Sequence, residues 1–383
     1  MQVDEALLEE WMRRYYFATE FDLGSSGVHP YTFAEVRALT GLTHDDMDGV
    51  GFEDSWTFGG PDVRRAVADR FAGGAVDRVM VTHGSSEAIF LSMCALLRAG
   101  DEVVVLDPAY QQLHGVATAL GCTLRRWHLR FDRGFRPDLD ELRALVTGRT
   151  RMIVVNFPCN PTGSTLAPQE QRELVDIAAR SGCYLVWDGA FTELTYDAGP
   201  LPDPGGWYER TVSFGTLSKA YGLPGLRVGW CLAAPEVLDR CARVRDYVSL
   251  HLSPMVELVA ERVVRNGDAL VGRRRELAAA NRAVLADWIA ERPGQVAWVP
   301  PAGGVSSFVH LREVADVEDF CRWLAHEHRI LLVPGTCFGH QGHARLGFGA
   351  PADELRRGLD LLGRALDDYR PGDGKRAAAL AAG

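Results

Sequence analysis

The sequence has no excess of positive charge, no long uninterrupted apolar run and no cysteine spacing typical of a metal site. Its 383 residues include 41 Lys and Arg against 51 Asp and Glu, which gives a formal net charge of −10. This balance argues against a nucleic-acid or membrane-surface role, because both favour concentrated positive charge. No apolar run reaches the roughly 18 residues that a membrane-spanning helix needs.

The eight cysteines are scattered, mostly within apolar segments, and they lack the paired spacing of zinc ligands. We therefore expect reduced, buried thiols and no bound metal. The first residues are acidic and contain no signal-peptide core. Together these features predict a cytoplasmic protein.

The length of the chain favours two domains, and a hydrophobic content of 47% is enough for large buried cores. Short apolar runs alternate with helical stretches from about residue 60 onward, which predicts right-handed crossovers and a mostly parallel sheet. The expected strands are residues 79–82, 102–106, 152–155, 184–187, 211–214 and 228–232. The predicted fold class is therefore α/β.

A change in composition after about residue 255 predicts where the domains divide. The expected parts are an N-terminal arm joined to the small domain (1–45), a large domain (46–255), a small α/β domain (256–370) and a flexible, Ala- and Gly-rich tail (371–383).

One segment, residues 213–230 (SFGTLSKAYGLPGLRVGW), places Lys219 between small hydroxyl residues and glycines. A lysine that forms a Schiff base needs a short approach path of this kind. Thr216 and Ser218 offer hydroxyl groups to a phosphate, and Arg227 offers a bidentate cation to the same group. Taken alone, a Ser-Xaa-Lys segment is more often an ordinary turn with a solvated lysine.

Four further segments favour a Schiff-base lysine over an ordinary turn. They are residues 83–88 (HGSSEA), 107–110 (DPAY), 156–163 (NFPCNPTG) and 187–191 (WDGAF). Each follows or ends a predicted strand, where ligands bind in open parallel sheets. With these segments in this order, the chain resembles the fold-type I, aspartate-aminotransferase-like family of pyridoxal-phosphate enzymes from about residue 20 to about residue 370.

The resemblance implies a cofactor, an architecture and an assembly. The cofactor is pyridoxal 5′-phosphate, bound to a large domain whose mostly parallel sheet is sandwiched by helices. A smaller α/β domain follows in the chain. Members of the family are homodimers with shared active sites, so the resemblance implies a homodimer. It also implies a small-molecule amino-acid substrate.

The cofactor phosphate needs several hydrogen-bond donors. Ser85 and Ser86 lead into a predicted helix, and the first amides of a helix bind anions well. Ser85 could instead be only a helix cap. In combination with Thr216, Ser218 and Arg227, a phosphate site is the better interpretation.

The remaining cofactor residues are assigned through the resemblance. Tyr110 matches the aromatic residue that stacks on the cofactor ring, although it could be an unrelated core tyrosine. Asp188 ends an apolar strand, where a carboxylate is costly unless it meets a cation such as a protonated pyridine nitrogen. Asn160 could donate to the phenolate oxygen of the cofactor, and could also serve as a turn residue before Pro161.

One position departs from the family pattern. Many relatives carry a tyrosine just after the aspartate that pairs with the pyridine nitrogen, and this chain has Phe191 at the closest matching place. Loss of that hydroxyl group should leave the pKa of the cofactor imine less depressed. It suggests chemistry other than routine amino exchange.

Substrate contacts are expected from two places. Arg345, in residues 344–349 (ARLGFG), matches the arginine that binds the substrate α-carboxylate, although it could be a surface arginine. Ser26, Gly27 and His29 lie on the segment that folds over the substrate in this family. Asn160 can also face the substrate. If the substrate carries a β-hydroxyl and a guanidine group, His29 could contact either; it could also be a plain loop histidine.

The opening segment, residues 22–33 (DLGSSGVHPYTF), is similar to the N-terminal signature of capreomycidine synthases, as are long tracts around Asp188 and Lys219. Those enzymes cyclise (2S,3S)-3-hydroxyarginine to capreomycidine in antibiotic biosynthesis. The reaction combines Cα deprotonation, β-elimination of water and intramolecular guanidine addition, and the resemblance gives Lys219 the role of base. The alternatives are an ordinary aminotransferase of a small amino acid and a cofactor-sensing regulator, which would need a basic DNA-binding module.

Overall fold

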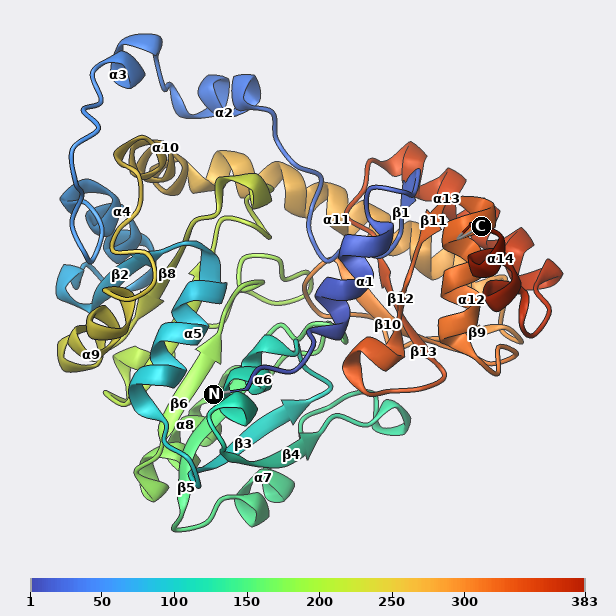
Figure 1. The fold of residues 1–383 in the computed structure, drawn as a ribbon, viewed down its shortest axis with the longest axis horizontal. Helices are drawn as coiled ribbons and strands as arrows, with labels where there is room; N and C mark the ends of the chain where they lie inside the picture. Colours follow the sequence, from blue (N-terminus) through green and yellow to red (C-terminus); the bar gives the residue numbers. More distant parts are fainter. Residues whose placement is uncertain (1, 382–383) are drawn as a thin grey trace.

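A mixed sheet forms the centre of the larger part of the molecule (Figure 1). The strand order is β2-β8-β7-β6-β5-β3-β4, and β8 runs antiparallel to both neighbours while the other pairs are parallel. The computed structural model describes residues 2–381. The strands are β2 (Val79–Thr82), β3 (Glu102–Asp107), β4 (Thr123–His128), β5 (Thr150–Asn156), β6 (Tyr184–Asp188), β7 (Thr211–Thr216) and β8 (Gly229–Leu232).

Helices cover both faces of this sheet, which explains why its central strands are apolar on both sides. In β2, for example, Met80 packs against one face while Val79 and Val81 pack against the other. The Met80 face is covered by α5 (Gly84–Leu96), α6 (Gln112–Ala119) and α9 (Pro235–Arg245). The opposite face is covered by α4 (Pro61–Phe71), α7 (Leu139–Leu145), α8 (Pro168–Ser181) and α10 (Pro254–Arg265). The predicted α/β class is confirmed.

A second, smaller sheet belongs to the C-terminal part of the chain (Figure 1). Its order is β12-β13-β10-β9, and all its pairs are antiparallel. A separate parallel pair joins β1 near the N-terminus to β11. The strands are β1 (Phe21–Asp22), β9 (Val296–Ala297), β10 (Ser306–Leu311), β11 (Ile330–Leu331), β12 (Val333–Pro334) and β13 (His343–Gly347). The pairing of β1 with β11 therefore places the N-terminal segment beside the smaller sheet.

The long helix α11 (Gly267–Ala290) runs from α10 toward the smaller sheet (Figure 1). That sheet is accompanied by α12 (Val317–Trp323) and α13 (Ala352–Asp368). Near the N-terminus, α2 (Phe33–Thr40) and α3 (His44–Asp48) each begin at a threonine capping box. All eight cysteines are free thiols, and no helix among residues 2–381 is long and apolar enough to span a membrane.

Helix α1 (Leu7–Tyr15) contacts both parts of the molecule. On the larger part, the Leu7 amide donates to Gln111 Oε1 at 2.9 Å, and Gln111 Nε2 donates to the Glu5 carbonyl at 2.7 Å. On the smaller part, Trp11 Nε1 donates to the Leu332 carbonyl at 2.9 Å. These bonds hold α1 across the junction of the two parts.

The C-terminal segment differs from the flexible tail predicted over residues 371–383, because helix α14 (Asp373–Ala381) forms there. The buried carboxylate of Asp319 accepts hydrogen bonds from the amides of Gly372, Gly374 and Lys375 and from the Tyr369 hydroxyl. Alanine-rich sequence has high helix propensity, so one anchored end is enough to order the segment. Residues 382–383 lie outside the described residues.

Replacing Asp319 tests this anchor. Asp319→Ala removes the acceptor of four hydrogen bonds and should lower the free energy of unfolding by about 3 kcal/mol. Urea unfolding followed by circular dichroism measures the change. The exposed Asp368→Ala serves as the control, and equal effects from the two variants would contradict the proposed anchor.

Candidate active site

Lys219 follows β7, and its amine points into a cluster of the predicted residues. The Nζ atom donates a hydrogen bond to Ser26 Oγ at 3.0 Å, which joins the lysine to the predicted substrate segment. Burial and, to a smaller extent, the positive charge of Arg345 lower the pKa of Lys219 to about 8. A large fraction of the amine is therefore neutral, and nucleophilic, at slightly alkaline pH.

The groups predicted to bind phosphate lie together at the start of α5. Gly84 has a φ of +70°, and a Cβ atom built on it would lie 2.8 Å from Arg227 Nη2, so glycine lets the guanidinium approach the helix N-terminus. Ser85 and Ser86 occupy the first turn of this helix. Arg227 Nη1 lies 3.4 Å from Ser218 Oγ. A cation, a hydroxyl and free helix amides thus meet at one point, as an anion site requires.

Thr216 has a supporting position in this group. Its Oγ1 lies 3.0 Å from Ser218 Oγ and 3.1 Å from the Val228 carbonyl, and it accepts the Ser218 amide at 3.1 Å. These contacts fix the turn that carries Ser218 and Lys219.

Asp188 lies at the end of β6 and is 4% exposed. Burial raises the pKa of its carboxyl group to about 6, while the Ala190 amide and the Lys219 charge oppose that shift. A buried carboxylate of this kind favours a cationic partner. Asn156 donates from Nδ2 to the Asp188 carbonyl at 2.9 Å and accepts the Asn160 amide at 2.7 Å. Asn156 lies within the motif of residues 156–163, but its positioning role is visible only in the structure.

Arg345 and Asn160 are neighbours in the same cluster. Arg345 lies on β13 and is 2% exposed, and burial lowers the pKa of its guanidinium to about 10. Its Nε donates to the Gly24 carbonyl at 2.9 Å, and its Nη1 donates to Asn160 Oδ1 at 3.2 Å. A buried cation near Lys219 is suited to bind a substrate carboxylate.

The aromatic residues border the same space. The Phe191 ring centroid lies 5.6 Å from Lys219 Nζ, so a buried ring without a hydroxyl group faces the amine. The Tyr110 hydroxyl donates to Glu9 Oε1 at 2.7 Å, and burial together with Glu9 raises the pKa of Tyr110. Glu9 could not be predicted from the sequence, because it lies about 100 residues before Tyr110 and no local pattern joins the two.

The predicted substrate segment reaches this cluster only in part. Ser26 contacts Lys219, and a Cβ atom on Gly27 would lie 3.9 Å from the Ser218 carbonyl. His29 is held through its backbone amide, which donates to the Gly349 carbonyl at 2.9 Å. Its imidazole is exposed and forms no hydrogen bond with residues 2–381. A substrate role for His29 therefore stays a prediction.

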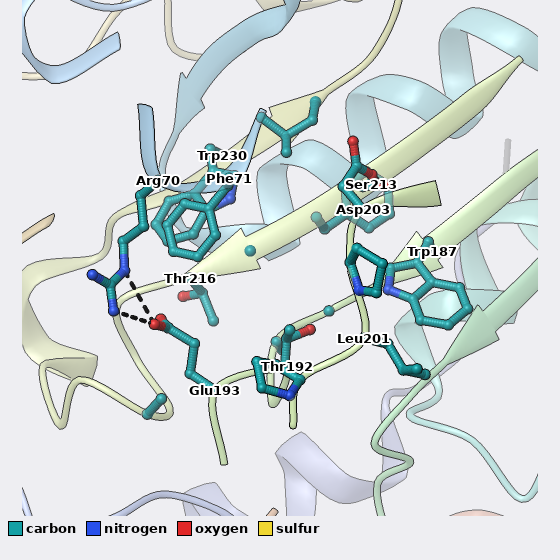
Figure 2. Close-up of a pocket in the computed structure, with 18 of the residues that line it drawn as sticks. Arg70, Phe71, Trp187, Thr192, Glu193, Leu201, Asp203, Ser213, Thr216 and Trp230 are labelled. Atoms are coloured by element: carbon teal, nitrogen blue, oxygen red, sulfur yellow. Dashed lines mark hydrogen bonds and ion pairs between the residues drawn. The ribbon is translucent and has the colours of Figure 1, made fainter. Parts of the chain in front are cut away.

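A separate cavity of about 530 Å³ lies next to this cluster (Figure 2). The figure shows the paired side chains of Arg70 and Glu193 at one end, with the rings of Phe71, Trp187 and Trp230 along the walls. Of the predicted site residues, Thr216 alone lines this cavity. The candidate active site is therefore the cluster around Lys219.

The residues present fit pyridoxal phosphate. Lys219 offers a buried amine of lowered pKa, and a buried carboxylate, a tyrosine ring and a group of anion-binding donors belong to the same cluster. These are the groups needed to bind an aldehyde, a pyridine nitrogen, an aromatic ring and a phosphate.

Comparison with known proteins agrees with this geometry. The family model "Aminotransferase class I and II" matches residues 55–362. Capreomycidine synthase from Streptomyces vinaceus is 47% identical over 369 residues, which cover 96% of this chain and 95% of that protein. Among solved structures, the PLP-dependent cyclase OrfR aligns with a TM-score of 0.92 and 48% identity, covering 96% of this chain and 98% of that one. A PLP-dependent aminotransferase from Streptococcus suis 89-1591 aligns with a TM-score of 0.91 and 31% identity, covering 97% and 99%.

The lowered pKa of Lys219 can be tested through cofactor incorporation. When apoprotein is mixed with pyridoxal phosphate, the rate of covalent attachment should rise with pH through a midpoint near 8, because the neutral amine is the nucleophile. Stopped-flow absorbance measures the rate, and Lys219→Ala gives the signal of non-covalent binding. A midpoint near 10.5, the ordinary pKa of lysine, would contradict the claim that burial lowers the pKa of Lys219.

Proposed function

The chain belongs to the class I and II aminotransferase family of pyridoxal-phosphate enzymes, and we propose that it converts (2S,3S)-3-hydroxyarginine to capreomycidine. The contact that carries this proposal joins Lys219 Nζ to Ser26 Oγ at 3.0 Å. It brings the opening segment, which resembles capreomycidine synthases, to the reactive amine. The 47% identity to the capreomycidine synthase of S. vinaceus along nearly the whole chain supports the same activity.

Each cofactor group has a partner in this chain. The α5 N-terminus with Ser85 and Ser86, together with Ser218 and Arg227, would hold the phosphate. Asp188 would pair with the pyridine nitrogen, Asn160 would donate to the phenolate oxygen, and Tyr110 would stack on the ring. When bound, pyridoxal phosphate withdraws electrons from the substrate Cα, which acidifies its proton and allows the β-hydroxyl group to leave.

The substrate would be fixed at its carboxylate by Arg345, which orients the Cα–H bond toward Lys219. The neutral Lys219 amine takes the Cα proton and later returns one. The β-hydroxyl group leaves as water by taking a proton from the Lys219 ammonium, and a guanidine nitrogen bonds to Cβ in its place and loses one N–H proton. The product keeps its α-amino group, so no oxidant and no keto acid takes part.

The activity assay uses purified enzyme, pyridoxal phosphate and (2S,3S)-3-hydroxyarginine without any keto acid. Mass spectrometry should detect a cyclic product lighter by one water. Lys219→Ala should reduce the rate about a thousandfold or more, because the base at Cα is lost. A 2-oxo product that forms only when a keto acid is supplied would instead identify an aminotransferase.

We also propose that the chain forms a homodimer through two exposed apolar loops. Phe52 and Trp56 precede α4, and Tyr247, Val248 and Leu250 follow α9; all five side chains are exposed. The loops are joined where His251 Nε2 lies 3.2 Å from Asp54 Oδ1 and where Arg245 Nη1 donates to the Thr57 carbonyl at 2.6 Å. A connected apolar surface of this kind is typical of an interface between subunits, and shared active sites are expected from the family.

Charged substitutions on these loops test the assembly. The wild-type chain should elute at twice 42.1 kDa in size-exclusion chromatography with light scattering. Trp56→Glu and Tyr247→Glu should shift the protein to the monomer mass, because each places a charge in an apolar interface. Val3→Glu, at an exposed apolar position outside both loops, is the control. A dimer that survives both loop substitutions would place the interface elsewhere.

A further inference from the structure

Helix α1 brings an acidic side chain to the active site. The helix is held by Gln111 on the larger part and by Leu332 on the smaller part. Figure 1 shows it lying over the junction between α6 and the strands of the smaller sheet. Its position places Glu9 beside Tyr110, whose hydroxyl donates to Glu9 Oε1 at 2.7 Å.

The Glu9 carboxylate lies close enough to act on the groups that would hold the substrate. Its negative charge opposes the lowering of the pKa of both Lys219 and Arg345. Its side chain is exposed, and its Oε2 atom has no hydrogen-bond partner among residues 2–381. Glu9 therefore keeps one carboxylate oxygen free to accept a hydrogen bond from a ligand.

The other carboxylates near the cluster have different surroundings. Asp22 Oδ1 accepts the amides of Gly24 and Ser25 at 3.0 and 2.8 Å, so it holds the turn of its own segment. Asp188 accepts the Ala190 amide and is buried. Asp107 is paired with His128 at 2.9 Å and also lies near Arg126. Glu9 is the exposed carboxylate among these four, so a cationic ligand can reach it.

We propose that Glu9 binds the guanidinium group of the substrate and so selects amino acids with a cationic side chain. The proposal rests on the function proposed above, because it assigns a contact to that substrate. Arg345 would hold the carboxylate, Lys219 would face Cα, and Glu9 would accept the guanidinium N–H groups. The free Oε2 atom can accept a guanidinium N–H, and the negative charge strengthens that hydrogen bond, so a neutral side chain of the same shape would gain much less.

The test compares two ligands that differ in one side-chain group. L-Arginine carries a guanidinium and L-citrulline carries a neutral urea of nearly the same shape. Isothermal titration calorimetry of the holoenzyme should show tighter binding of arginine. Glu9→Gln should weaken arginine binding about tenfold and leave citrulline binding unchanged, because the amide still accepts the Tyr110 hydroxyl but carries no charge.

Glu10→Gln is the matched control. Glu10 lies on the same helix and pairs with Arg13 at 2.6 Å, so its loss should leave both affinities unchanged. Equal weakening of both ligands by Glu9→Gln would show a structural role and overturn the proposal, as would no change in either. Failure of wild-type enzyme to cyclise 3-hydroxyarginine, with arginine selectivity still dependent on Glu9, would overturn the proposed reaction and leave the cation contact standing.

Discussion

The close burial of two cationic side chains, Lys219 and Arg345, is the constraint on which the active site depends. Neither charge is easily kept away from water, so burial lowers the pKa of both groups. For Lys219 the result is an amine of which a large fraction is neutral at slightly alkaline pH. Arg345 keeps its proton, so its buried positive charge is stabilised by a nearby anion. The α-carboxylate of an amino acid is such an anion.

The fold supplies this arrangement by joining distant segments at the carboxyl ends of parallel strands. Asp188 ends β6, Lys219 follows β7, and Asn160 follows β5. Arg345 comes from the smaller sheet, and the N-terminal segment adds Ser26 and Gly24 between the two parts. Because the site is built from both parts, a movement of one part against the other would change its geometry. Such a movement would accompany the folding of the N-terminal segment over a substrate.

Strands buried on both faces could be predicted because their sequences are continuously apolar, and β2 coincides with its predicted range. The edge strand β4 was missed, because Thr123, Arg125 and Arg126 make its sequence polar. Such residues are tolerated there because β4 pairs with a single neighbour and stays partly exposed. Helix α14 was missed because its anchor, Asp319, lies far away in the sequence. Motifs located the residues proposed to hold the cofactor, since each lies in a local pattern. Glu9 has none, and only the docking of α1 brings it to Tyr110.

The most direct test of the account follows the α-nitrogen through the reaction. The substrate would be 3-hydroxyarginine labelled with ¹⁵N at the α-amino group, and single-turnover product would be analysed by mass spectrometry. Since Lys219 is proposed to move protons at Cα while nitrogen stays on the substrate, the cyclic product should retain the label fully. Transfer of the label to the cofactor, with an unlabelled or 2-oxo product, would contradict the account.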